Sequence, residues 1–253
     1  MNKLNLHMLK LGMGLLLTLP LVARAAPGIV GSSHDFTATT NFWAGGVTNW
    51  VPNGDVCSEC HTIHNTKAGQ TAYRAAGPLW VHTVSTETYT PFTSATLSAA
   101  GYPAGGTPGW GSLACLSCHD GSVAINSQNG KLVGSGTTSV FVPSWAVIAV
   151  GGTDLSGTHP IGIDYTTVRT ALPNEFNDPT TLVANAGVDS GVKSVAGELL
   201  FNETAQSGAA TAVECCSCHD IHQRIGMSGT LKDSIKIGTA TSITPLCITC
   251  HIK

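Results

Sequence analysis

The sequence predicts a single unit of mostly irregular backbone, with short helices at repeated Cys-x-x-Cys-His segments and a small β-hairpin. Charged residues make up only 11% of the chain, and 29 of its 253 residues are glycine. Ordinary soluble domains carry about 25% charged residues. Hydrophobic periodicity is weak, and Gly and Pro interrupt the spacers 62–114 and 120–214. The most informative observation is that the Cys-x-x-Cys-His motif occurs four times.

The four copies, numbered motifs 1 to 4, are Cys57-Ser-Glu-Cys60-His61, Cys115-Leu-Ser-Cys118-His119, Cys215-Cys-Ser-Cys218-His219 and Cys247-Ile-Thr-Cys250-His251. This pattern is the attachment signal for c-type haem. The two thiols bond the two vinyl groups of the porphyrin, and the adjacent imidazole binds the iron. Paired Cys-x-x-Cys is also a zinc-ligand spacing, and disulfides are a third interpretation. Neither explains a histidine directly after every second cysteine.

The sequence therefore predicts four covalently attached haems, numbered by motif, with the chain wrapped around them as a multihaem cytochrome c. The porphyrins would supply much of the apolar core. The predicted attachment residues are Cys57, Cys60, Cys115, Cys118, Cys215, Cys218, Cys247 and Cys250. The predicted proximal ligands are His61, His119, His219 and His251. Cys216 is left over and is interpreted as a small packing residue, with a reactive thiol as the alternative.

Residues 1–25 match a secretory signal, with basic Lys3 and Lys10, an apolar run from Leu11 to Val22, and Ala23-Arg24-Ala25 as the cleavage site. The run is short for a membrane anchor, which needs about 20 residues, and we expect no membrane span. Residues 26–253 are expected to form one domain. Removing the signal takes the formal net charge from −3 to −6, which disfavours a nucleic-acid partner.

Regular elements are expected at few other places. The run 139–150 is strand-like and is expected to form a small hairpin, although Pro143 interrupts it. A short helix is expected within 192–206. No linker divides the chain.

The sixth iron ligand decides whether a haem transfers electrons or performs chemistry at an open iron. Outside residues 1–25 the chain has one methionine, Met227, so histidine is the expected ligand at most haems. His61-Thr-Ile-His64 and His219-Asp-Ile-His222 place a second histidine on the same side of a helical turn. That second ring cannot reach the opposite face of its own haem, so it should bind a different iron. His34, His159 and His82 are the other candidates, with His82 expected to be the spare.

The order SSHDF, CSECHTIH, PLW, ACLSCHDGSVA, GTHPIGIDY, ECCSCHDIH and LCITCH resembles the secreted multihaem cytochromes with doubled motifs, in particular the extracellular tetrahaem cytochromes that polymerise into filaments. The resemblance runs from about Val30 to His251. It implies bis-histidine haems in alternating parallel and T-shaped pairs, and one distal histidine taken from the neighbouring subunit. It implies the distal ligands His34, His64, His159 and His222. His34 is the expected donated residue, while His82 keeps the assignment open.

The expected function is extracellular electron transfer through four bis-histidine haems, without enzymatic bond chemistry, in a head-to-tail filament. Homo-oligomers, other cytochromes and extracellular electron acceptors are the expected partners. Two alternatives remain open. One is a soluble periplasmic carrier with the same haems, and the other is a haem reductase with an open iron.

Overall fold

The computed structural model describes residues 28–30, 32–37, 55–62, 79–99, 108–134, 138–185, 191–201, 211–222 and 245–252. The predicted signal segment and His64 lie outside these residues. The described helices are α2 (Ala95–Ala99), α3 (Trp110–His119), η2 (Ser144–Ala146), α4 (Tyr165–Ala171), α5 (Val195–Leu199), α6 (Cys215–Cys218) and α7 (Pro245–Cys250). The described strands are β1 (Ser127–Gln128), β2 (Lys131–Leu132), β3 (Ile163–Asp164), β4 (Leu182–Asn185), β5 (Gly191–Ser194) and β6 (Ala212–Val213).

The strands form three separate two-stranded antiparallel sheets, β1–β2, β3–β6 and β4–β5. The β1–β2 hairpin closes through Asn129 and Gly130, whose φ angles are 50° and 76°. Positive φ at both central residues is the type I′ turn that Asn-Gly favours. In β3–β6, Ile163 lies opposite Val213, so this sheet holds the chain just before motif 3 against the chain just before α4. None of the described helices is long and apolar enough to cross a membrane.

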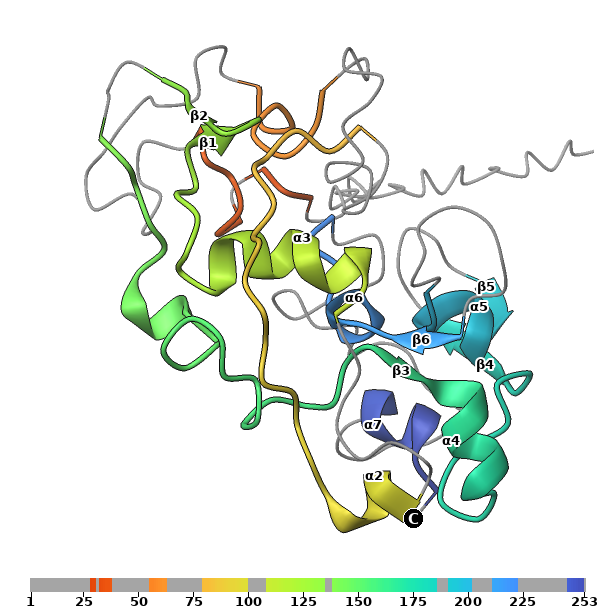
Figure 1. Ribbon diagram of the computed structural model, residues 1–253. Helices are drawn as coiled ribbons and strands as arrows, with labels where there is room; N and C mark the ends of the chain where they lie inside the picture. The colour runs from red at the N-terminus through yellow and green to blue at the C-terminus, as the bar shows by residue number, and fades with distance from the viewer. Residues whose placement is uncertain are drawn as a thin grey trace, which may run out of the picture.

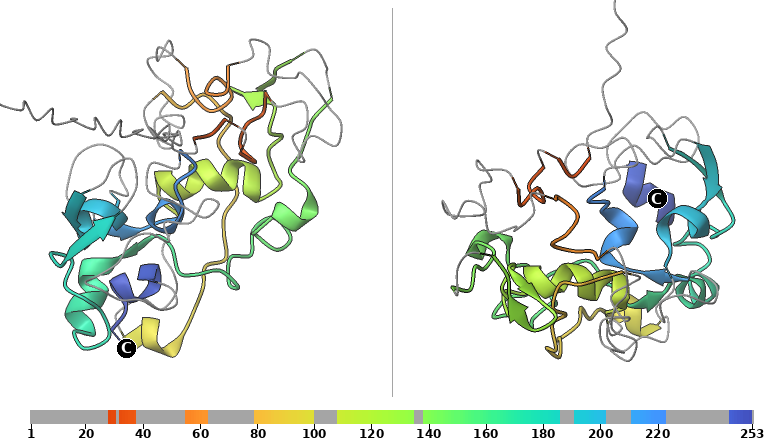
Figure 2. Two further views of the ribbon diagram at one scale, coloured as in Figure 1. Left: turned by 180° about the vertical axis from the view of Figure 1, so that it is seen from behind. Right: turned by 90° about the horizontal axis from the view of Figure 1, so that it is seen from above.

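The attachment motifs follow one another along the molecule in chain order (Figure 1). Residues 55–62 lie at one end with β1–β2, α3 and α6 lie in the middle, and α7 lies with α2 and α4 at the other end. The view from behind in Figure 2 shows the same order. Helix α3 contains the whole of motif 2. Helix α6 begins at the first cysteine of motif 3, and helix α7 includes both cysteines of motif 4. Motif 1 is a turn instead, in which the His61 amide donates to the Cys57 carbonyl at 2.9 Å.

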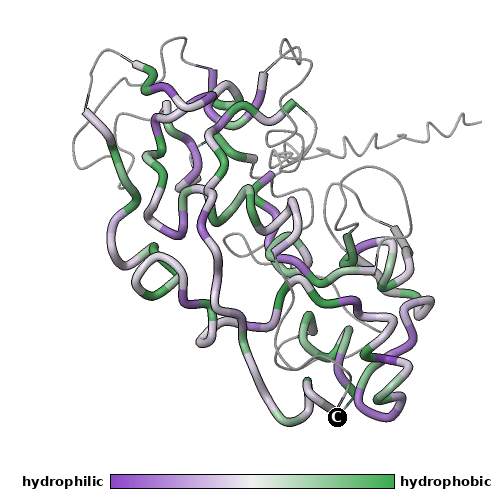
Figure 3. The backbone as a smooth tube through the Cα atoms, in the orientation of Figure 1, coloured by the Kyte–Doolittle hydropathy of each residue, from purple (hydrophilic) through white to green (hydrophobic). Residues whose placement is uncertain are grey.

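Buried apolar residues gather in small clusters along this axis. One contains Leu97, Ile163 and Val168, a second contains Leu116, Ala149 and Leu155, and a third is built on Ile125. Figure 3 shows the same dispersal, with short apolar stretches alternating with polar ones along the tube. A protein domain usually has one contiguous core, whereas the described apolar residues form several small clusters.

The structure differs from the expected hairpin at 139–150. Val140 and Val142 pack toward Ile125 while Phe141 is 46% exposed, so the alternation of a strand is present. The backbone nevertheless turns into η2 directly after Pro143. Proline lacks the amide that a strand ladder needs, and hairpins form elsewhere, in β1–β2 and β4–β5. The helix expected within 192–206 is present but shorter. It is α5, which spans Val195–Leu199, and residues 191–194 belong to β5 instead.

Candidate haem sites

The cysteines of neighbouring motifs lie close together. Cys60 raises the pKa of Cys118 beyond the effect of burial, and Cys115 hydrogen-bonds Cys215. Cys218 similarly acts on Cys250. These interactions act between motifs 1 and 2, between motifs 2 and 3, and between motifs 3 and 4, and only the one between motifs 2 and 3 is a hydrogen bond. All nine cysteines lie within the described residues, and none of them forms a disulfide there.

Burial keeps most of these thiols neutral. It raises the pKa of Cys60 and of Cys250 to about 12, and it raises the pKa of Cys118 well above its usual range. A thioether bond to haem leaves an uncharged sulfur, and buried surroundings of this kind suit such an uncharged sulfur. Among the described residues, no three His, Cys, Asp or Glu side chains form a metal-binding group.

Six histidine rings come together as three pairs. The ring centroids are 6.2 Å apart for His61 and His222, 6.1 Å apart for His34 and His119, and 6.3 Å apart for His159 and His251. An iron between two imidazoles requires two metal–nitrogen bonds of about 2 Å plus about 1 Å from each nitrogen to its ring centre, so about 6 Å between centroids. Each pair contains one proximal histidine of a motif. The spacing fits axial ligation of a haem iron by both rings.

The pairs join parts of the chain that are distant in sequence. His222 follows motif 3 but faces His61 of motif 1, which agrees with the expectation that the second histidine of a doubled motif serves another iron. His159, in the loop before β3, faces His251. His34 faces His119 of its own chain, whereas the sequence led us to expect that His34 is donated to a neighbouring subunit. His219 lies within the described residues, whereas His64, the fourth expected distal ligand, lies outside them.

Burial favours the neutral, iron-binding form of two of the paired imidazoles, His34 and His61. Burial, with smaller contributions from the charges of His119, His219 and His222, lowers the pKa of His34 to about 4. Burial also lowers the pKa of His61, with a further contribution from His222. The protonated ring has no free nitrogen to offer a metal. Both environments therefore favour a ligand over a surface cation.

Backbone carbonyls orient two of the paired rings. His119 Nδ1 donates to the Ala146 carbonyl at 2.8 Å, and His159 Nδ1 donates to the Pro160 carbonyl at 2.9 Å. A carbonyl can only accept, so the proton resides on Nδ1 and Nε2 remains free for a metal. The His222 Nδ1 differs, because it lies 3.5 Å from a carboxylate oxygen of buried Asp220.

His82 occupies a different environment. It is 1% exposed, and its Nε2 lies 3.2 Å from the Ala124 carbonyl and 3.5 Å from the sulfur of Cys118. Its ring lies 6.1 Å from that of Trp80, between centroids. Because Nε2 faces a carbonyl and a cysteine rather than a second imidazole, this geometry favours the spare role expected for His82.

Glu214 links motif 2 to motif 3. This carboxylate is 1% exposed, accepts the Gly109 amide at 3.0 Å, and accepts the hydroxyl of Ser112. Gly109 is the N-cap of α3, which lacks a side-chain cap of its own, and Glu214 is also the N-cap of α6 in a capping box with Ser217. One carboxylate therefore satisfies amides at the start of two helices. The sequence shows only a glutamate before a cysteine, so this role could not be read from it.

Comparison with known proteins adds no relative. No protein-family model, no curated protein and no solved structure matches this chain. The interpretation of the sites therefore depends on the motifs and on the geometry described above.

Cys216 fills the space beside Gly111. Its sulfur lies 2.5 Å from the position that a Cβ atom on Gly111 would take, while its own Cβ lies 3.9 Å from that position. Replacing Gly111 with alanine should favour the helix by about 1 kcal/mol. The clash with Cys216 should cost more, about 1–3 kcal/mol. We therefore expect Gly111→Ala to lower the free energy of unfolding, as measured by chemical denaturation.

The double variant Gly111→Ala/Cys216→Ala is the matched test of this contact. Alanine at 216 removes the sulfur and leaves two methyl groups in ordinary contact, so the double variant should recover most of the loss. Additive effects of the two substitutions would show that Cys216 does not pack at this position.

Proposed function

We propose that this chain is a tetrahaem c-type cytochrome that transfers electrons through four bis-histidine haems. The proposed axial pairs are His61–His222 at haem 1, His119–His34 at haem 2, His219–His64 at haem 3 and His251–His159 at haem 4. The observation that carries the proposal is that three proximal histidines each face a second imidazole at 6.1–6.3 Å between centroids. The fourth pair follows by matching the remaining proximal and distal candidates.

Each haem, when bound, supplies an iron that cycles between the ferric and ferrous states. The chain contributes thiols that anchor each porphyrin and imidazoles that fill both axial positions, which disfavours substrate binding at the metal. The backbone carbonyls of Ala146 and Pro160 orient His119 and His159. The hydrogen bond between Cys115 and Cys215 and the order of the motifs along the molecule support a continuous series of haems from motif 1 to motif 4.

The test is a haem count by intact mass together with the coordination state by absorption spectroscopy. We expect four haems per chain, low-spin spectra in both oxidation states, and no binding of carbon monoxide to the reduced protein. Changing Cys115 and Cys118 together to serine should remove one haem. Fewer than four haems in the wild-type chain, or stoichiometric zinc, would contradict the proposal. A high-spin haem that binds carbon monoxide would favour a reductase.

We further propose that copies of the chain assemble into an extracellular filament that passes electrons to external acceptors. Support comes from the resemblance to filament-forming tetrahaem cytochromes and from the signal-like residues 1–25. Within one chain His34 faces His119. Exchange of the segment 32–37 between copies would place the same contact between subunits, as in domain swapping.

Electron cryo-microscopy of the secreted material tests this second proposal. Filaments with haem density continuous across subunit boundaries are expected, whereas discrete particles with four six-coordinate haems would favour a soluble periplasmic carrier. A His34→Ala variant that still polymerises with four six-coordinate haems would exclude His34 both as an internal ligand and as a donated one.

A further inference from the structure

Two of the proposed proximal histidines each contact an aromatic side chain, and each of these aromatic residues lies on a short extended segment. Trp80 forms an antiparallel bridge with His61, in which Thr62 donates to the Leu79 carbonyl at 2.8 Å and Val81 donates to the Cys60 carbonyl at 2.9 Å. The Trp80 and His61 rings meet edge to face, with centroids 5.7 Å apart and an interplanar angle of 88°. The indole therefore restricts rotation of the His61 ring about its side-chain bonds.

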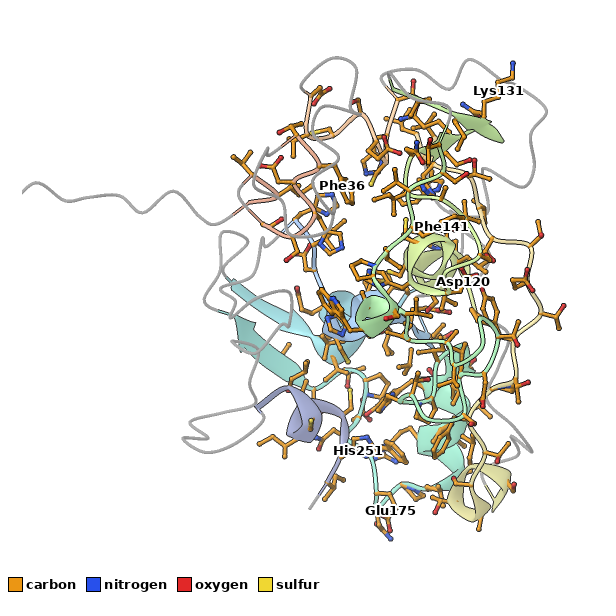
Figure 4. The ribbon with its side chains drawn as sticks, turned by 90° about the vertical axis from the view of Figure 1, so that its left-hand side faces the viewer. Phe36, Asp120, Lys131, Phe141, Glu175 and His251 are labelled. Carbon is orange, nitrogen blue, oxygen red and sulfur yellow. The ribbon has the colours of Figure 1, made fainter. Side chains whose placement is uncertain are left out.

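His251 at the other end of the molecule has an equivalent contact. Phe176 forms an antiparallel bridge with it, with Asn177 donating to the Cys250 carbonyl and Ile252 donating to the Glu175 carbonyl, each at 2.8 Å. The two rings lie 4.8 Å apart at 46°. Figure 4 shows His251 beside Glu175 at this end, while Phe36, Phe141 and Asp120 lie around α3.

Both aromatic segments are held by hydrogen bonds in addition to their ring contacts. The segment around Trp80 continues to the β1–β2 hairpin, where Thr83 donates to the Ser127 carbonyl at 2.8 Å. The segment around Phe176 is held by buried Tyr165, whose hydroxyl lies 2.8 Å from the Asn177 carbonyl and 3.0 Å from the Cys250 carbonyl. An anchored aromatic can impose an orientation on an imidazole, because it does not move with it.

The angle between the two imidazole planes of a pair differs between the two ends of the molecule. The angle is 26° for His61 and His222 and 76° for His159 and His251. Imidazole π-orbitals mix with two iron d-orbitals. Near-parallel planes separate these orbitals in energy, and near-perpendicular planes leave them almost equal. The separation stabilises ferric iron, which has one vacancy in these orbitals, more than ferrous iron, which has none.

We propose that Trp80 and Phe176 are positioning residues that fix the planes of His61 and His251, so that haem 1 has near-parallel and haem 4 near-perpendicular axial imidazoles. This inference rests on the proposed function. It assigns to two loop residues the electronic difference between the haems at the two ends of the series, because axial-ligand geometry is one of the protein's controls over a haem.

Electron paramagnetic resonance of the frozen ferric protein tests the inference. The wild-type chain should show two classes of low-spin signal, one rhombic and one strongly anisotropic. Trp80→Leu should remove one haem equivalent of intensity from the rhombic class and raise the midpoint potential of haem 1. Phe176→Leu should instead change the strongly anisotropic class. Trp80→Phe, which keeps an aromatic edge, should resemble the wild type.

Trp110→Leu and Phe201→Leu are the matched controls, because these two rings contact each other at 6.3 Å between centroids. Both should leave the signals of haems 1 and 4 unchanged. A single low-spin class in the wild-type protein would overturn the inference even if the leucine variants failed to fold. Unchanged spectra in folded Trp80→Leu and Phe176→Leu would overturn it as well. Missing or high-spin haems in the wild type would instead count against the proposed function.

Discussion

His222→Ala is expected to convert one of the four haems from six-coordinate to five-coordinate, and the affected haem should be haem 1 rather than haem 3. The His222 ring lies 6.2 Å from that of His61, although His222 follows motif 3 in the sequence. The reduced variant should bind one equivalent of carbon monoxide. Because the His222 side chain is 47% exposed, added imidazole should reach the open iron and restore the low-spin spectrum.

His82→Gln is the matched control for this experiment. His82 is buried and faces the Ala124 carbonyl and Cys118 rather than another imidazole. Glutamine keeps a donor for the carbonyl, so all four haems should stay six-coordinate. Carbon monoxide binding by His82→Gln, or its absence in His222→Ala, would contradict the proposed ligand assignment.

Glu214→Ala is expected to cause a large loss of stability, about 3–7 kcal/mol. The substitution leaves the Gly109 amide and the Ser112 hydroxyl buried without their acceptor, and each such group costs about 1–3 kcal/mol. It also removes the cap of α6, worth about 1 kcal/mol. Denaturant titration of the haem-loaded protein, followed by circular dichroism, measures the change.

Glu87→Ala is the control for Glu214→Ala, since Glu87 is exposed. A surface substitution of this kind should change the free energy of unfolding by no more than about 0.5 kcal/mol. Equal effects of the two substitutions would show that Glu214 does not hold the starts of α3 and α6 together.

The attachment thiols and proximal histidines could be proposed from the sequence because covalent attachment of a c-type haem requires a spacing fixed within five residues. The spacing of His219 and His222 also indicated that the second ring serves another iron. It could not indicate which iron, because the facing residue His61 depends on how distant segments fold together. The contact between His34 and His119 was missed for the same reason.

Trp80 and Phe176 show a different limit of sequence reasoning. Each meets its histidine through a single antiparallel bridge, which is too short to produce any hydrophobic periodicity. The Asn129-Gly130 turn of the β1–β2 hairpin, in contrast, was a readable signal. The strand-like run 139–150 was misleading, because alternation marks one extended face but does not supply a partner strand.

Because the chain is synthesised from its N-terminus, the two histidines of each described pair become available in a different order relative to the haem-attachment motif. His34 precedes motif 2 and His159 precedes motif 4, so haems 2 and 4 can complete their coordination as soon as they are attached. His61 faces a residue beyond motif 3. In the proposed tetrahaem protein, haem 1 would be attached first during N-to-C synthesis and export, and its second ligand, His222, would be missing until the chain beyond the third motif emerges. A chain arrested between motifs 2 and 3 is therefore expected to carry one finished haem and one exposed one.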